Sequence, residues 1–153
     1  MHKSILVVED NDTMRLGIEE SLRREGYEVL AFDNGPDAIN AFKQNPSRLA
    51  IIDLKMEPMD GNEVLTKIKS ISPATETLMI SAFGTVETAV NSMQKGASDF
   101  LTKPFSPDEL RIRVKNLLDK FSSLKETFNA QKEEFKGILD ENKIKKFLEL
   151  LNN

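Results

Sequence analysis

LAIID, at residues 49–53, is a short apolar run that ends in a carboxylate, and it is the clearest indication of the fold. A similar run, ILVV at residues 5–8, ends in Glu9-Asp10, and a third, DFLT at residues 99–102, ends in Lys103-Pro104. Short runs of this kind, each followed by a helical pattern, predict parallel strands joined by crossover helices. The carboxyl ends of such strands lie along one edge of the sheet, where ligands bind. We therefore expect three carboxylates and a lysine to meet at that edge.

The predicted cluster of acidic side chains calls for a cation, because crowded carboxylates repel one another unless a positive charge lies among them. Oxygen ligands alone favour a hard ion such as Mg²⁺, which keeps several waters and commonly bridges to a phosphate. The chain has no cysteine, which excludes thiolate metal sites, disulfides and cysteine nucleophiles. The strand ends are therefore interpreted as a place that holds a phosphoryl group.

Strand and helix signals alternate through the first 119 residues. We expect strands at 4–9, 28–32, 49–53, 77–81 and 99–102, and helices that begin near residues 13, 35, 62, 86 and 106. Asp12 and Asn62 are the predicted caps of the first and third helices, and Gly26 and Gly96 the predicted stops of the first and fourth. Strict alternation implies an α/β fold with a doubly wound five-stranded parallel sheet. The right-handed crossover rule favours the flavodoxin-like strand order 2-1-3-4-5.

The fifth helix is predicted to continue well past the compact domain. Its apolar residues recur at alternating steps of three and four, which is a heptad seam: Val114, Leu117, Phe121, Leu124, Phe128, Gln131, Phe135 and Ile138. A continuous helix from Glu109 to Asp140 would be about 48 Å long. The stripe either folds back on its own domain or pairs with another helix, and we favour a homodimer through residues 109–140.

The pattern divides the chain into two parts. Residues 1–120 form the expected domain, and residues 121–153 form a helical extension, a possible coiled-coil linker that ends in a short amphipathic piece with Ile144, Phe147, Leu148 and Leu151. The sequence leaves open whether the natural protein ends there.

Composition excludes several classes of function. The chain has 153 residues and a net charge of −4, and its first 119 residues hold fourteen basic and nineteen acidic side chains, too acidic a balance for binding a nucleic-acid backbone. No apolar stretch approaches the length of a membrane span, and the N-terminus lacks the apolar core of a signal peptide. His2, the only histidine, lies at a terminus that we expect to be mobile, so a histidine-kinase role is excluded. We expect a cytoplasmic protein.

Taken together, these positions resemble the receiver domain of two-component response regulators. The resemblance rests on Glu9-Asp10, Asp53, Ser81-Ala82 and Lys103-Pro104 and covers about residues 3–120. The stretches GTVETAV at residues 84–90 and FLTKPF at residues 100–105 are similar to the nitrogen-regulator (NtrC-like) subgroup. That subgroup places the receiver ahead of an ATPase and a DNA-binding module, and this sequence contains neither.

The resemblance implies the chemistry of the site. Asp53 would be the nucleophile that accepts a phosphoryl group from a phosphohistidine on a sensor histidine kinase. Lys103 would pair with one phosphoryl oxygen and Ser81 would donate its hydroxyl to another, while Ala82 leaves room for the donor. A cis peptide is expected before Pro104. The Mg²⁺ ligands would be Asp10, Asp53, the Lys55 carbonyl and, through water, Glu9.

The resemblance also implies an output step and tuning positions. Movement of Ser81 toward the phosphoryl group would vacate space for Phe100 and change the face formed by the fourth and fifth helices. A permanently buried Phe100 is the alternative. Lys55 and Phe83 occupy positions that tune phosphoryl lifetime, and the bulk of Phe83 predicts slow self-dephosphorylation. Glu57 stands where the family usually has proline, and Pro58 comes one place later.

Three functions remain open from the sequence. The leading one is a phosphorylation-controlled signalling switch, not an enzyme, that acts on an unknown output partner, a missing downstream domain or its own dimer. A phosphatase of the haloacid-dehalogenase type is the second, because the stretch from Asp10 to Thr13 weakly echoes its motif, although it leaves Asp53 unexplained. The third is a phosphorylation-silent pseudo-receiver that serves as a dimerisation module.

Overall fold

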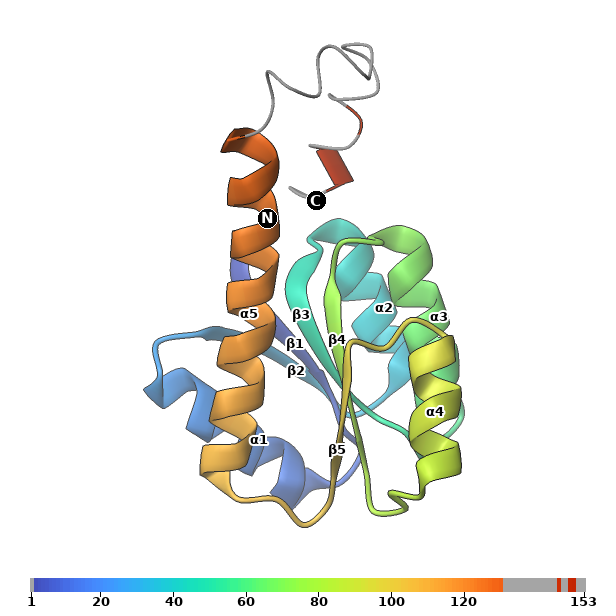
Figure 1. Cartoon of the computed structure of the whole chain (residues 1–153). Helices are drawn as coiled ribbons and strands as arrows, with labels where there is room; N and C mark the ends of the chain where they lie inside the picture. Colours follow the sequence, from blue (N-terminus) through green and yellow to red (C-terminus); the bar gives the residue numbers. More distant parts are fainter. Residues whose placement is uncertain (1, 131–145, 147–148, 151–153) are drawn as a thin grey trace.

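Five strands and five helices alternate in the computed structural model, which describes residues 2–130, 146, 149 and 150. The strands are β1 (His2–Val8), β2 (Glu28–Phe32), β3 (Ser47–Asp53), β4 (Glu76–Ser81) and β5 (Asp99–Thr102). The helices are α1 (Asp12–Arg24), α2 (Gly35–Gln44), α3 (Gly61–Ile71), α4 (Val86–Gln94) and α5 (Pro107–Ala130). All neighbouring strands are parallel, in the order β2-β1-β3-β4-β5 (Figure 1). The predicted fold and strand order are confirmed.

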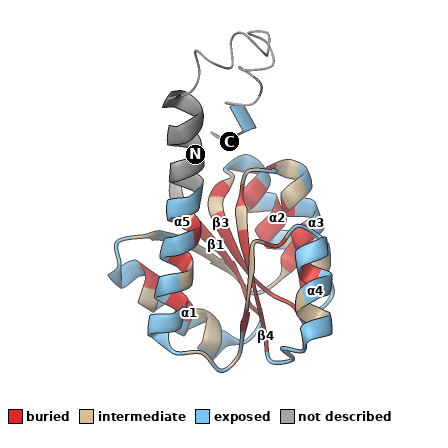
Figure 2. Ribbon diagram, in the orientation of Figure 1, coloured by how far each residue is buried: buried red, intermediate tan, exposed pale blue. Residues whose placement is uncertain are grey.

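The sheet lies between two layers of helices (Figure 1). On one face Ile5 and Val7 of β1 pack with Ile18 of α1 and Val114 of α5. On the other face the alternate residues of the strands pack against α2 and α3. Every residue of β3 except Arg48 is buried (Figure 2), as expected of a central parallel strand covered on both sides. Full burial of one such aliphatic side chain contributes about 1.5–3 kcal/mol, so β3, which ends in Asp53, is firmly anchored in the core.

The predicted helix caps are wrong by one or two residues at two helices. Asn11, and not Asp12, caps α1, because its side chain accepts a hydrogen bond from the Met14 N–H. Asp60, and not Asn62, caps α3 in the same way, through the N–H of Glu63. The predicted stops are confirmed, since Gly26 and Gly96 follow α1 and α4 with φ of 88° and 105°, a conformation that glycine adopts without strain.

Helix α5 begins as part of the core and then leaves it. The Ser106 hydroxyl accepts the Glu109 N–H at 3.1 Å, and Leu110, Val114 and Leu117 are buried against the sheet. The first two positions of the predicted heptad seam therefore pack on their own domain. The ribbon of α5 continues beyond the sheet to Ala130 (Figure 1).

The predicted pairing of residues 109–140 stays a prediction. Its positions beyond Ala130 lie outside the described residues, as do Ile144, Phe147, Leu148 and Leu151 of the short amphipathic piece.

His2 does not stand apart from the fold as the sequence suggested. It is the first residue of β1 and pairs with Ser47 of β3, so the backbone of this terminus belongs to the sheet.

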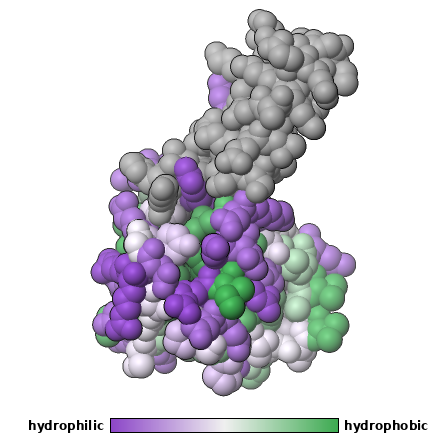
Figure 3. Space-filling model, turned by 60° about the vertical axis from the view of Figure 1, so that its left-hand side comes forward, coloured by the Kyte–Doolittle hydropathy of each residue, from purple (hydrophilic) through white to green (hydrophobic). Residues whose placement is uncertain are grey.

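The surface seen in Figure 3 is mainly hydrophilic, with small separate apolar patches. Exposed apolar side chains include Val86, Val90 and Met93, which share one side of α4 at steps of four and three residues, and Ile112 of α5. In the part of the chain that the structure describes, no helix is long and apolar enough to span a membrane.

Candidate functional site

Three carboxylates converge at the carboxyl edge of the sheet. Glu9 and Asp10 directly follow β1, and Asp53 is the last residue of the neighbouring strand β3. One carboxylate oxygen from each lies within 4.8 Å of the others. Parallel neighbouring strands end at the same edge, which is why residues 43 positions apart in the chain meet here.

Lys103 supplies the positive charge of this cluster. It follows β5 and reaches across the edge, so that its Nζ donates to Glu9 Oε1 at 2.5 Å and to Asp53 Oδ1 at 3.3 Å. The peptide that links it to Pro104 is cis, as expected, and the Glu57–Pro58 peptide is cis as well. Lys103 thus bridges two of the three carboxylates.

Burial sets the protonation of the cluster. The Glu9 side chain is fully buried, and this burial, with the neighbouring Asp53, raises the pKa of Glu9 to about 7 despite the contact with Lys103. Burial alone would lower the pKa of Lys103, but the hydrogen bonds and charges of Glu9 and Asp53 raise it instead. Lys103 therefore remains a cation beside carboxylates that still carry more negative charge than it neutralises.

The donor set fits a hard divalent cation. Glu9, Asp10 and Asp53 offer only oxygen atoms, and the second carboxylate oxygen of Glu9, Oε2, is buried without a hydrogen-bond partner among the described residues. Such an oxygen is costly unless a cation or donor reaches it. The exposed side chain of Asp10 borders an open pocket of about 610 Å³ that Lys55, Glu57 and Asp60 also line. An ion and its waters have room on that side.

Ser81 completes the ring of strand ends. It is the last residue of β4 and is 1% exposed, and its hydroxyl oxygen accepts the N–H of Phe83 at 3.0 Å. The Lys103 N–H donates to the Ser81 carbonyl at 2.7 Å, so the ends of β4 and β5 are tied together. Ala82 follows and is exposed, which leaves the approach to this edge open.

The other predicted residues lie around this centre. Phe100 of β5 is partly buried and packs against the core beneath α2 and α3, an arrangement compatible with both the switch and the permanent-core hypotheses. Lys55 and Phe83 lie at the mouth of the site, where the Lys55 ammonium is 4.0 Å from the centre of the Phe83 ring. The ring is nevertheless 56% exposed.

Two residues of this region were missed from the sequence. Arg15 of α1 donates to the Glu9 carbonyl at 3.0 Å and pairs with Asp12, and no sequence signal marks it. Thr88 of α4 donates toward the Phe83 carbonyl at 2.9 Å. The spacing of Thr85 and Thr88 is that of a capping box, so the sequence does carry a signal for Thr88 as part of a helix cap.

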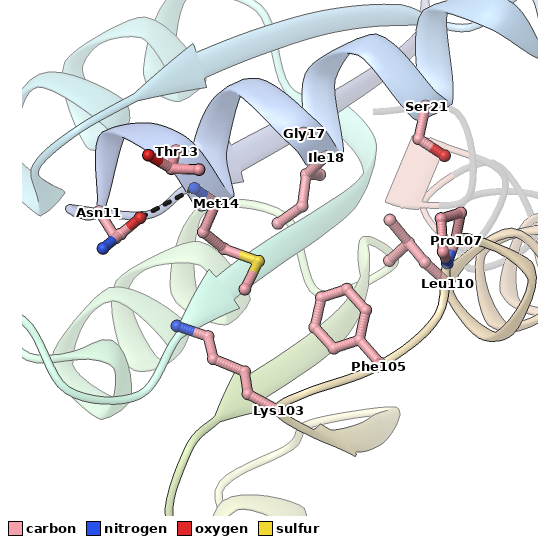
Figure 4. A pocket seen from close by; sticks show the side chains of 10 residues that line it. All are labelled: Asn11, Thr13, Met14, Gly17, Ile18, Ser21, Lys103, Phe105, Pro107 and Leu110. Carbon is pink, nitrogen blue, oxygen red and sulfur yellow. Dashed lines mark hydrogen bonds between the residues drawn. The ribbon is translucent and has the colours of Figure 1, made fainter.

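An apolar pocket of about 420 Å³ lies beside the carboxylates, between α1 and the segment that leads into α5 (Figure 4). Met14 and Ile18 line it from α1, and Phe105 and Leu110 line it from the other side. Lys103 is also part of its lining, so the pocket and the carboxylate cluster share this one side chain. The carboxylates themselves do not line the pocket.

Sequence comparison places these features in a known context. The profile of the response regulator receiver domain matches residues 5–115. The transcriptional regulatory protein SrrA of Staphylococcus aureus (strain NCTC 8325 / PS 47) is 35% identical over 123 residues, which are 80% of this chain and 51% of SrrA. The chain thus spans about half the length of the curated relatives it matches.

Solved structures agree with this comparison. The signal receiver domain of a putative LuxO repressor protein from Vibrio parahaemolyticus superposes with a TM-score of 0.76 at 32% identity, over 83% of this chain and 97% of that one. The receiver domain of NtrX from Brucella abortus superposes with a TM-score of 0.72 at 33% identity, over 75% and 98% of the two chains. The fold, the strand-end cluster and these matches lead to one conclusion: the chain belongs to the response regulator receiver domain family of two-component systems.

Proposed function

We propose that this protein is a phosphorylation-controlled switch in which Asp53 accepts a phosphoryl group from a sensor histidine kinase. The observation that carries the proposal is the convergence of Glu9, Asp10 and Asp53 around the ammonium of Lys103. A receiver domain is a signalling switch and implies a histidine kinase as its partner. An oxygen of Asp53 attacks the phosphorus of the phosphohistidine, a P–O bond forms, the P–N bond breaks, and its electron pair returns to the imidazole.

We assign Mg²⁺ as the cofactor, held by Asp10, Asp53, the Lys55 carbonyl and, through water, Glu9. The ion would neutralise the charge that otherwise keeps a phosphoanion away from three carboxylates. Lys103 would then exchange its contact with Asp53 for one with a phosphoryl oxygen. The Ser81 hydroxyl would donate to another oxygen, and the exposed position of Ala82 supports access by the donor.

The output surface in this proposal is the face of α4, β5 and α5. Ser81 and Phe100 would connect the site to that face, which carries the exposed apolar residues Val86, Val90 and Met93. Its partner would be a second copy of the chain, through residues 109–140, or a separate output protein or domain. The proposed division is a receiver at 1–120 and a helical extension at 121–153.

We also propose that this receiver belongs to the NtrC-like subgroup of response regulators. The similarity to NtrX from Brucella abortus supports this assignment, although the other relatives include SrrA and a putative LuxO repressor protein.

A kinase as phosphoryl donor accords with the cytoplasmic location expected from the sequence. The protein would catalyse only its own phosphorylation and dephosphorylation.

The test is the mass of the intact chain after incubation with acetyl phosphate, with and without Mg²⁺. We expect the gain of one phosphoryl group that needs Mg²⁺ and disappears in Asp53→Asn. Asp37→Asn is the matched control, since this carboxylate lies in the first turn of α2 and its loss should leave the gain intact.

Two outcomes would support the alternatives instead. A chain that gains no phosphoryl group and does not respond to beryllofluoride would be a silent pseudo-receiver. Turnover of a phosphate ester that survives Asp53→Ala but not Asp10→Ala would indicate a phosphatase.

A further inference from the structure

The segment between β4 and α4 is fixed by hydrogen bonds at both of its ends. At the β4 end, the Phe83 N–H donates to the buried Ser81 hydroxyl oxygen at 3.0 Å. At the α4 end, the Phe83 carbonyl accepts from the Thr85 N–H at 3.0 Å and from the Thr88 hydroxyl at 2.9 Å. The backbone of one residue, Phe83, therefore connects the Ser81 hydroxyl at the end of β4 to the first turn of α4.

The contact with Phe83 leaves the Ser81 hydroxyl free to act. A hydroxyl has one proton to donate and two lone pairs that accept. The Phe83 N–H occupies one lone pair, and among the described residues the structure gives the Ser81 proton no acceptor. The Phe83 amide can therefore orient the oxygen while the proton remains available for an anion at Asp53.

Thr88 holds the Phe83 carbonyl, and with it the backbone of Phe83, in this position. Its hydroxyl has two carbonyls within reach, those of Phe83 and Thr85, both at 2.9 Å. The same hydroxyl forms the capping box of α4 with Thr85. Gly84 lies close against β5, since a Cβ there would collide with the side chain of Thr102. The loop is thus held between β5 and the first turn of α4.

We propose that Thr88 is a positioning residue for the phosphoryl site: through the Phe83 backbone it holds the Ser81 hydroxyl in its donating position. The proposal rests on the proposed function, since the Ser81 proton is directed to a phosphoryl oxygen. It also gives a route outward, because a pull on Ser81 is transmitted through the two peptide groups that flank the Phe83 Cα to the start of α4.

The experiment measures the affinity of the full chain for beryllofluoride in the presence of Mg²⁺. Thr88→Val keeps the shape of the side chain but lacks the hydroxyl, and we expect binding about threefold to tenfold weaker, the effect of one lost hydrogen bond. Thr88→Ser restores the hydroxyl and should restore affinity. In the Ser81→Ala background, Thr88→Val should have no further effect, because the hydroxyl that it positions is gone.

Thr85→Val is the matched control for capping. It removes the other hydroxyl of the capping box and leaves Thr88 beside the Phe83 carbonyl. Both variants should lower the thermal unfolding temperature, but only Thr88→Val should weaken beryllofluoride binding. Equal weakening by the two variants, or an undiminished effect of Thr88→Val in Ser81→Ala, would overturn the proposal.

A second measurement needs no substitution. Hydrogen exchange of the Phe83 amide should slow when beryllofluoride and Mg²⁺ bind, since a hydroxyl that donates is a stronger acceptor. Unchanged or faster exchange would contradict the proposal. If the wild-type chain does not bind beryllofluoride at all, the proposed function itself fails. If the wild-type chain binds it and the Thr88 variants bind it equally well, only the role of Thr88 is rejected.

Discussion

Glu9 is the residue at which burial and charge oppose each other most strongly. Its side chain is fully buried and touches Lys103 on one oxygen, while the other oxygen has no partner among the described residues. Without a metal ion, a proton is the available means of removing the excess negative charge. For this reason the pKa of Glu9 is about 7 in the folded chain, against 4.5 for an ordinary glutamate.

This shift predicts a stability that depends on pH. Folding favours protonated Glu9, so its stabilising contribution is complete below about pH 4.5 and is lost as the pH rises through about 7. In the presence of EDTA we expect the thermal unfolding temperature to fall between about pH 5 and pH 8. With Mg²⁺ present the ionised form is favoured, and the fall should disappear or reverse.

Glu9→Gln is the control for this prediction, because the amide does not titrate. Its unfolding temperature in EDTA should be flatter across the same range. A wild-type protein whose metal-free stability rises over that range would show that Glu9 stays ionised beside Lys103.

The second prediction is that the Phe83 ring shields the phosphoryl site from water. The ring is held by the Lys55 ammonium at 4.0 Å, and we expect the pair to restrict the access of water to an aspartyl phosphate. Phe83→Ala should shorten the phosphoryl half-life about twofold to fivefold, the equivalent of one exposed cation–π contact of about 0.5–1 kcal/mol. The measurement is the loss of the phosphoryl mass after the donor is removed.

Phe83→Leu separates bulk from the cation–π contact, and it should give an intermediate half-life. The backbone N–H that reaches Ser81 is kept in both variants. If Phe83→Ala holds its phosphoryl group no less long than the wild type, the shielding hypothesis is wrong.

At the scale of the elements, the sequence predicts what parallel-sheet geometry dictates and misses what depends on loop paths. Glu9, Asp53 and Lys103 could be placed together because each lies at the carboxyl end of a strand of one sheet. The cap of α3 could not be predicted as well, since both Asp60 and Asn62 are good caps. The returning loop decides between them: the Gly61 N–H donates to the Leu54 carbonyl at 2.8 Å, which starts the helix at Gly61.

The role of Thr88 was missed for a related reason. Its hydroxyl meets the Phe83 carbonyl only because the 82–85 segment turns back over the start of α4. No periodicity in the sequence encodes that turn. Contacts within a strand or helix follow from spacing, whereas contacts between a loop and a helix follow from the path that packing imposes.

Two glycines allow a matched test of how tightly the elements are packed. A Cβ at Gly17 of α1 would meet no atom within 4 Å, whereas one at Gly84 would collide with Thr102. Gly17→Ala should raise the free energy of unfolding by about 0.5–1 kcal/mol, since alanine favours the helix. Gly84→Ala should lower it by about 1–3 kcal/mol through overpacking. Urea denaturation measures both, and equal effects of the two substitutions would contradict the predicted difference.

At the scale of the whole molecule, α5 belongs to two parts of the chain. Leu110, Val114 and Leu117 complete the core, while the later positions of the predicted heptad seam are proposed to pair with a second copy. A chain ending at Lys120 keeps every residue that the structure describes as buried. It should therefore fold, bind beryllofluoride with Mg²⁺ and remain monomeric, while the full chain forms dimers.

Light scattering over a range of concentrations checks this division. The beryllofluoride response of the shortened chain serves as the control for folding. A shortened chain that still dimerises would place the interface on the domain, and a full chain that stays monomeric at every concentration would reject the paired helix.

The anchoring of α5 at one end has a mechanical consequence. From Lys120, whose ammonium pairs with Glu76 of β4 at 3.9 Å, to Ala130 the helix extends on the order of 15 Å past its last described anchoring residue (Figure 1). A tilt of roughly 10° about the anchored turns would sweep the far end through about 3 Å, given the rise of an α-helix. The domain can thus act as the base of a lever arm, so that displacements too small to disturb its interior become large at the far end of the helix.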